Sequence, residues 1–376
     1  MEHRRVVFID LLRGWAGLVM IEVHAVNAFL LPEIRSAGWF PILNFVNGLV
    51  APSFLFVAGL VFIVVSERKL EEFRTYGGLF WKQSGRILMI WGVGYFLHLP
   101  FFSFSQTLKE TTPETWLKFF QADVLHCIAA GLLLLFAARI VVRRNEVLGG
   151  LLWFWTAVIV VIAPFLWDVD FNRFLHPAVG AYVNAQHFSQ FPLFPWLGFL
   201  FLGGILGLKY LRSRAENREA SFIKSVAWWG AACVAMALLV GDSLPIPGAT
   251  GDIRPQPVFF VLRFGVVLLL FGGFWLYGHI RKTERSFVLT VSRETLLVYA
   301  AHLLIIYGTF WNDRSLSGLY GHSLTMAQSA AATLGLVVVM AGVAELWGRV
   351  KRKSLPLARN LSLAGGLIAF LIFLIK

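Results

Sequence analysis

Apolar residues occur along this chain in blocks of about 20, separated by short segments that carry the charged residues. A helix of about 20 residues, rising ~1.5 Å per residue, crosses the ~30 Å hydrocarbon core of a bilayer. Strands of an outer-membrane barrel would instead show ~10-residue stretches of alternating polar and apolar residues, and the sequence lacks them. The pattern therefore predicts an all-α fold, a polytopic integral membrane helical bundle.

The apolar blocks predict about eleven transmembrane helices. They lie at Val6–Leu31, Pro41–Ser66, Gly85–Phe102, Val124–Val142, Val147–Trp167, Phe191–Tyr210, Phe222–Val240, Pro257–Tyr277, Thr295–Trp311, Thr325–Trp347 and Leu361–Ile375. The first block carries four ionisable residues and precedes no small-residue cleavage site, so we expect it to be retained as a helix rather than removed as a signal peptide. All connections are short, so we expect a single transmembrane domain over residues 1–376.

The composition agrees with a membrane protein. Hydrophobic residues make up 58% of the chain and charged residues 14%, with a mean hydropathy of +0.71. Soluble domains carry about 25% charged residues, so a soluble globular protein is excluded. Cys127 and Cys233 both lie inside apolar blocks and give no disulfide framework. The sequence also shows no Gly-rich phosphate loop, metal-binding helix motif or nucleophile elbow.

The net charge of +12 has a topological explanation. When the span-edge residues Arg86, Arg139, Lys209 and Lys224 are counted with their adjacent connections, 24 of the 33 Lys and Arg residues lie at the N-terminus and in the even-numbered connections. Another 7 lie in the odd-numbered connections and at Lys376, and Arg13 and Arg263 lie inside spans. Positively charged loops stay on the cytoplasmic side, so we predict a cytoplasmic N-terminus and an extracytoplasmic C-terminus. Anionic headgroups complement the basic side. We therefore expect the bilayer as a partner, no nucleic acid, and the inner (plasma) membrane of a bacterium as the location.

The first predicted helix carries a polar stripe. Arg13 and His24 are eleven residues apart, which places them within ~20° on one face and ~16 Å apart along the axis. Asp10 falls near the same stripe. Ionisable residues inside a membrane are costly and usually face a polar cavity or a partner. His24 is thus a candidate site residue or an interhelical structural histidine, and Arg13 is a candidate ligand or a snorkelling interfacial arginine.

Two later segments carry further candidates. In QADVLHCIAAG, Asp123 and His126 share one helical face and suit the binding of a hydroxyl group, although Asp123 is also in position for an ordinary N-cap. In SRETLLVYAAHLL, Tyr299 and His302 share a face, and His302 is either a site residue or a packing histidine. Basic residues at the cytoplasmic helix ends, Arg86 among them, suit the phosphates of a nucleotide-like donor, but topology alone explains them too.

Several segments together carry a familiar pattern. They are IDLLRGWAGLVMIEVH (Ile9–His24), APSFLFVAGLVF (Ala51–Phe62), DVLHCIAAGLLLL (Asp123–Leu135), FPLFPWLGFLFLGGILG (Phe191–Gly207) and SRETLLVYAAHLLII (Ser292–Ile306). In this order they resemble the heparan-α-glucosaminide N-acetyltransferase family, within the superfamily of transmembrane acyltransferases. That superfamily shows an Arg, ten residues and then a His, which Arg13 and His24 match.

The resemblance implies a single transmembrane acyltransferase-like domain and an acetyl-CoA-dependent enzyme, an N- or O-acetyltransferase. Such an enzyme takes an acetyl (acyl) group from the cytoplasm and delivers it to a hydroxyl or amino group of a sugar or glycan on the far side. The lysosomal enzyme of the family has its key histidine in the loop after the first helix, ahead of an Asn-Gly pair. Here the corresponding stretch, Leu31–Gly48, contains Asn47 and Gly48 but no histidine. The role would pass to His24, as in the wider superfamily, or to His126.

Acyl transfer from a thioester chiefly needs a base for the acceptor and a hydrogen-bond donor for the developing oxyanion. Histidine suits the first role because its pKa lies near neutrality. We predict His24, Asp123, His126 and His302 as catalytic residues, and we expect no metal. We predict that Arg13, Asp10, Arg86 and Tyr299 bind the acyl-CoA donor.

Two other functions fit the same residues. A transporter of small solutes or lipids with no covalent chemistry would also line its path with intramembrane His, Arg and Glu residues. A membrane scaffold would use them only to join helices. Binding or slow hydrolysis of acetyl-CoA would favour the transferase, and the sequence leaves the choice between a monomer and a homodimer open.

Overall fold

The computed structural model describes residues 6–241, 256–281, 286–308 and 314–376. All regular elements in these ranges are helices, and the single β-bridge there joins Leu30 to Leu324. The end of the predicted span Thr295–Trp311 lies outside the described residues. The described helices group into two compact units, each formed from segments that are distant in sequence.

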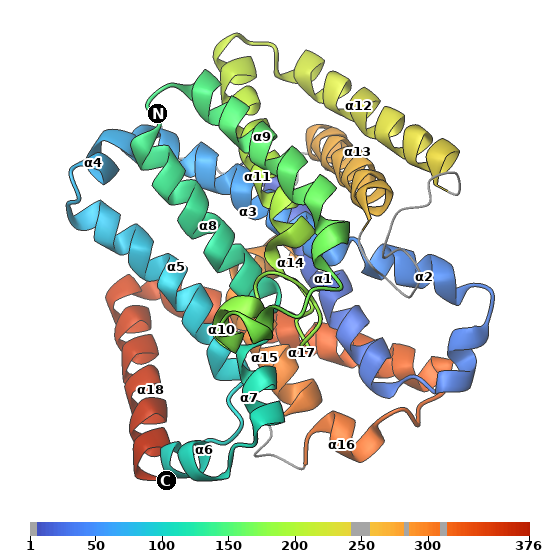
Figure 1. Ribbon diagram of the computed structural model, residues 1–376, viewed down its shortest axis with the longest axis vertical. Coiled ribbons are helices and arrows are strands. Elements are labelled where there is room, and N and C mark those ends of the chain that lie inside the picture. Colours follow the sequence, from blue (N-terminus) through green and yellow to red (C-terminus); the bar gives the residue numbers. More distant parts are fainter. Residues whose placement is uncertain (1–5, 242–255, 282–285, 309–313) are drawn as a thin grey trace. The chain divides into compact units, whose positions relative to one another are not determined.

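The first unit comprises Met1–Val50, Tyr95–Phe119 and Lys282–Lys376. Its helices are α1 (Val7–Phe29), α2 (Phe40–Asn47), α6 (Phe104–Glu110), α7 (Pro113–Phe120), α14 (Phe287–Arg293), α15 (Thr295–Tyr307), α16 (Leu316–Tyr320), α17 (Met326–Lys353) and α18 (Leu355–Ile375), with a 3-10 turn at Pro32–Ser36 (Figure 1). α1 packs against α14, α15 and α17. At Gly14, a Cβ would overlap the carbonyl oxygen of Val288, so the absence of a side chain permits the close approach of α1 to α14.

The second unit comprises Ala51–Gly94 and Phe120–Arg281. Its helices are α3 (Val50–Ser66), α4 (Leu70–Arg74), α5 (Gly78–Leu97), α8 (Val124–Val141), α9 (Asn145–Leu166), α10 (Pro177–Gly180), α11 (Leu193–Ala215), α12 (Glu219–Val240) and α13 (Pro257–Arg281), with 3-10 turns at Glu67–Lys69 and Phe171–Arg173. The largest packing interfaces are α12 with α13 and α9 with α11. α3 and α11 approach closely at Gly59 and Gly203, where a Cβ would overlap a backbone carbonyl oxygen of the facing helix.

The helices confirm the all-α membrane fold. Each of the eleven predicted ranges overlaps a described helix. Among the described residues, eight helical segments are long and apolar enough to cross a membrane, or nine if the bent pair α14–α15 forms one span. α1, which carries Asp10, Arg13 and Glu22, has the length but is not in that set.

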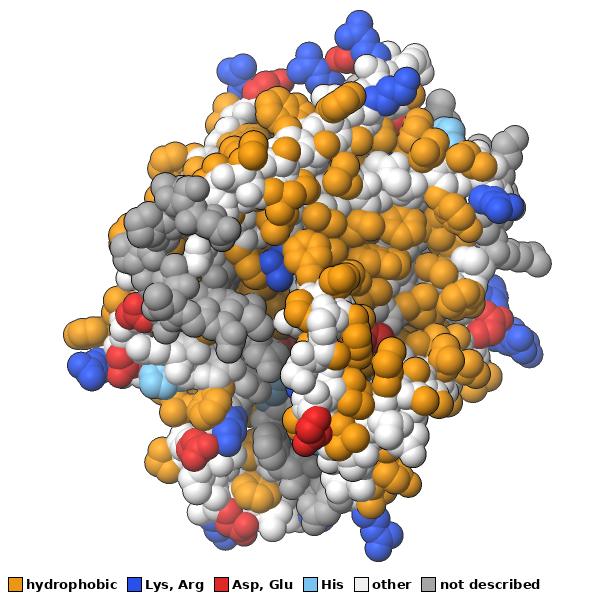
Figure 2. Space-filling view, turned by 90° about the vertical axis from the view of Figure 1, so that its right-hand side faces the viewer, with side chains coloured by type: hydrophobic (Ala, Val, Ile, Leu, Met, Phe, Trp, Pro, Cys, Tyr) orange, Lys and Arg blue, Asp and Glu red, His pale blue; other side chains and the backbone are white. Residues whose placement is uncertain are grey.

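Many large apolar side chains are exposed, and hydrophobic side chains cover much of the face in Figure 2. Trp228 is 77% exposed, Leu239 81%, Val338 70% and Ile375 85%. A soluble protein of this size would not expose apolar surface so continuously. These side chains form the lipid-facing surface of an integral membrane protein.

Candidate active site

Arg13 joins two helices of the first unit. One of its Nη atoms donates to Asp10 Oδ1 at 2.8 Å, one turn earlier in α1. Its Nε donates to Ser292 Oγ at 3.0 Å, in α14. Ser292 is buried, whereas the Arg13 side chain keeps 26% of its surface exposed. Asp10 and Arg13, which the sequence places near one stripe of the first helix, therefore form an ion pair, and Arg13 also bonds to Ser292 of α14.

His24 and His302 meet at the other end of this stripe. Their ring centroids lie 5.1 Å apart, with the planes tilted by 49°. Tyr307 adds a third ring, 5.8 Å from His24, and its hydroxyl donates to the His24 backbone oxygen at 3.2 Å. The sequence presents both histidines as candidates, but it gives no sign that residues from α1 and α15 form a pair.

The hydrogen bonds of His302 fix which ring nitrogen carries the proton. Its Nδ1 lies 2.7 Å from the carbonyl oxygen of Val298, one turn earlier in α15. A carbonyl oxygen only accepts, so Nδ1 is the donor and Nε2 carries the lone pair. Nε2 is buried and makes no hydrogen bond to any described residue. Tyr299, whose ring is edge-on at 5.8 Å, is the buried neighbour that the sequence predicts for His302.

A 90° bend between α14 and α15 positions these groups. Ser286 is the N-cap of α14, and its hydroxyl accepts from the Leu289 amide. At the bend, the buried Glu294 accepts from Lys351 Nζ of α17 at 2.6 Å. Ser292 on α14 thereby contacts Arg13, while His302 on α15 lies beside His24. Discontinuous helices of this kind commonly form binding sites in membrane proteins.

The second unit contains the pair Asp123 and His126. Asp123 caps α8: its Oδ1 accepts from the His126 amide at 2.9 Å and lies 2.6 Å from His126 Nδ1. The cap that the sequence allowed is thus present, and the same carboxylate orients the imidazole. The ring packs directly on Gly94, where a Cβ would lie 2.7 Å from His126 Cε1. Tyr182 lies 6.3 Å from the ring and accepts from Trp91 Nε1 at 2.5 Å.

Arg86, the remaining predicted donor ligand, is exposed on α5 of the second unit. It makes no hydrogen bond or ion pair with the described residues. Arg86 therefore offers a positive charge to a ligand, but the described residues form no binding site around it.

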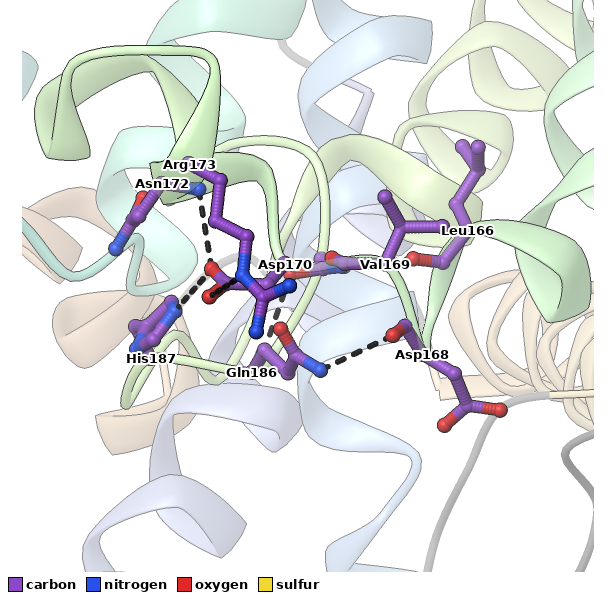
Figure 3. A network of polar contacts seen from close by, with 9 residues as sticks. Leu166, Asp168, Val169, Asp170, Asn172, Arg173, Gln186 and His187 are labelled. Carbon is purple, nitrogen blue, oxygen red and sulfur yellow. Dashed lines mark hydrogen bonds and ion pairs between the residues drawn. The ribbon is translucent and has the colours of Figure 1, made fainter.

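The loop between α9 and α11 forms a polar hollow of about 460 Å³. Figure 3 shows His187 and Arg173 pointing to the carboxylate of Asp170. His187 Nε2 lies 2.8 Å from Asp170 Oδ1, and Arg173 Nε donates to Asp170 Oδ2 at 3.2 Å. The side-chain amide of Gln186 donates to the Asp168 backbone oxygen at 3.2 Å. The hydrogen bond from His187 holds the pKa of Asp170 below its ordinary value, and Arg173 adds to the effect. The sequence alone does not predict this cluster, because the pairing of these residues depends on the fold of the loop.

The comparison with protein families decides the assignment. The sequence model of the family described as heparan-alpha-glucosaminide N-acetyltransferase, catalytic, matches residues 5–240. The chain belongs to this family. It is a membrane acetyltransferase of the heparan-α-glucosaminide N-acetyltransferase family, with the α1 stripe and the Asp123–His126 pair inside the matched range. α14 and α15 lie after the matched range, so the family match does not include His302. Its position beside His24 is known from the structure alone. No curated protein matches the chain.

Proposed function

We propose that this acetyltransferase takes the acetyl group of cytoplasmic acetyl-CoA and transfers it to a hydroxyl or amino group of an extracytoplasmic sugar or glycan. The observation that carries the proposal is the pairing of His24 with His302, whose buried Nε2 has a lone pair and no partner among the described residues. A neutral imidazole held in one tautomer is a suitable general base.

In the proposed reaction, His302 Nε2 takes the proton from the acceptor as its oxygen or nitrogen attacks the acetyl carbonyl carbon. The bond from the acetyl carbon to the CoA sulfur breaks, and the proton on His302 passes to the departing thiolate. Acetyl-CoA supplies the thioester, which needs little further activation. His24, whose ring is adjacent to that of His302, is proposed to hold the reacting group or to carry the acetyl group transiently.

The donor is proposed to enter from the side of Arg13. Arg13 follows the cytoplasmic N-terminus that the charge distribution predicts, and its guanidinium suits a phosphate or a carbonyl oxygen. His24 lies ~16 Å further along α1, towards the opposite side of the membrane. Donor and acceptor are therefore proposed to reach the histidine pair from opposite sides of a bacterial inner membrane.

The other predicted residues keep proposed roles. Asp123 and His126 orient the acceptor through their carboxylate–imidazole bond, Arg86 supplies charge for the donor, and Tyr299 shapes the wall beside His302. We further propose that residues 1–376 function as a single acyltransferase-like domain. The choice between a monomer and a homodimer stays open.

A direct test uses purified protein in detergent with radiolabelled acetyl-CoA and glucosamine as the test acceptor. Formation of acetylated sugar, at a rate that depends on protein concentration, is the expected result. The rival is a transporter without covalent chemistry. Uptake of sugar into proteoliposomes that is indifferent to CoA, with no acetylated product, would favour that rival and contradict the proposal.

A further inference from the structure

An open basic pocket of about 810 Å³ lies in the first unit, between the α14–α15 bend and the junction of α17 with α18. Its lining includes four basic side chains and one acidic side chain: Arg293, Lys351, Arg352, Lys353 and Glu294. Such a charge balance favours a ligand with several negative charges.

Ion pairs neutralise only part of this charge. Lys351 is bound to Glu294 at 2.6 Å, and Arg352 donates to Glu345 at 2.9 Å. Arg293 and Lys353 are exposed and form no ion pair or hydrogen bond with any described residue. Two positive charges in the pocket are thus available to a ligand.

The backbone adds to the same preference. The 21-residue helix α18 begins at the pocket with Leu355, and Ser354, its N-cap, accepts from the Leu357 amide at 3.2 Å. The N-terminus of a helix carries a positive partial charge and attracts anions. Gly348 of α17 also lines the pocket.

The pocket adjoins the Arg13 end of the candidate active site. Arg293 follows Ser292, the residue that accepts from Arg13 Nε. From the first residue of α15 to His302 is seven residues, a rise of ~10 Å. Both connections that form the pocket belong to the basic, cytoplasmic set of the predicted topology. An extended ligand with its phosphates in the pocket would therefore point its other end along α15 to the histidines.

We propose that this pocket binds phosphate groups, those of the nucleotide end of the CoA donor, with Arg293 and Lys353 as the two free charges. The inference rests on the proposed function, because it assigns the far end of the same donor. A phosphate monoester on an anionic lipid headgroup offers the same chemistry, so the test must separate the two sources.

The experiment measures the Kd of purified protein for CoA, dephospho-CoA and pantetheine, with the variant Arg293→Gln/Lys353→Gln. Both residues are exposed, so the variant should fold. We expect the Kd for CoA to rise by about tenfold or more, the scale of one lost charge-assisted hydrogen bond, and the Kd for pantetheine to stay unchanged. Arg359→Gln is the matched control, an exposed arginine of α18 outside the pocket lining, and should bind CoA like the wild type.

Each other outcome overturns the inference in a recognisable way. Equal CoA binding by variant and wild type would remove the pocket from the donor site and leave the proposed function standing. If the variant lost only the thermal stabilisation given by vesicles containing phosphatidic acid, the pocket would be a lipid site. A wild type that binds neither CoA nor pantetheine would contradict both the inference and the proposed function.

Discussion

Replacing His302 with Gln removes the base of the proposed reaction. Glutamine keeps a polar side chain of comparable length but has no basic nitrogen. General acid–base catalysis contributes ~10²–10⁴-fold, or about 2.7–5.5 kcal/mol of the activation barrier. His302 is fully buried and its Nε2 has no partner among the described residues, so the substitution breaks no hydrogen bond at that atom. We therefore expect His302→Gln to lower kcat at least ~100-fold in a folded protein.

The rings of His24 and His302 lie 5.1 Å apart, so we expect the two histidines to act in the same step and their substitutions to be non-additive. Groups that act in one step are strongly non-additive, whereas independent groups multiply their effects. His24→Gln should also lower kcat ~100-fold, and the double variant should fall within about twofold of the slower single variant. Two independent groups would instead lower kcat by ~10⁴-fold.

The assay is acetyl transfer from radiolabelled acetyl-CoA to an amino sugar, with folding checked by size-exclusion chromatography and thermal unfolding. His279→Gln is the control, because His279 is exposed on α13 and its ring lies beside that of Trp275, with the centroids 4.1 Å apart, outside the histidine pair. Its activity should equal that of the wild type. A His302→Gln variant that keeps wild-type kcat would refute the assignment of the base.

Three further predictions concern packing, donor binding and the outer loop. Gly203→Ala should destabilise the protein by about 1–3 kcal/mol, because the new Cβ would overlap the Phe56 carbonyl oxygen. Gly204→Ala is the control for this variant, because its Cβ would lie 3.4 Å from a Leu152 methyl group. In a thermal-unfolding measurement, Gly204→Ala should unfold at nearly the wild-type temperature. Arg13→Gln should raise the KM for acetyl-CoA about tenfold or more by removing a charge-assisted contact, and an unchanged KM would assign Arg13 to structure alone. The hydrogen bond from His187 holds the pKa of Asp170 below its ordinary value, so this bond stabilises the folded protein. Its contribution is fully present above the unfolded-state pKa of ~3.9 and is lost as pH falls through the folded-state pKa. The difference in Tm between wild type and Asp170→Asn should therefore shrink on acidification, and a difference independent of pH would show that the bond does not contribute.

Helix content and the local polar pairs follow from the sequence because they depend on near neighbours. The Asp10–Arg13 ion pair and the Asp123 cap are both interactions over three residues, which helical spacing predicts. The pairing of His24 with His302 does not follow, since it joins helices far apart in the chain through tertiary packing.

Breaks within apolar blocks are also poorly marked in the sequence. The block Pro41–Ser66 lies within one candidate span of the structure, Phe40–Arg74, as predicted, but the sequence does not mark the boundary between α2 and α3 inside it. The bend at Glu294 cannot be predicted from the sequence either, because a charged residue next to an apolar block is interpreted as the end of a span. The buried Glu294–Lys351 bond supplies the compensation that permits the charge there, and Lys351 lies on a different helix.

The proposed transfer of the acetyl group across the membrane can be measured in sealed vesicles. The protein is reconstituted into liposomes that contain glucosamine only in the lumen, and accessible cysteines introduced at Arg214 and Phe174 report the orientation. Radiolabelled acetyl-CoA is then added outside. In vesicles with the Arg214 side outward, we expect acetylated glucosamine inside the lumen and ~100-fold less of it with His302→Gln. Acetylation that occurs only when glucosamine and acetyl-CoA share the outer compartment would contradict this expectation.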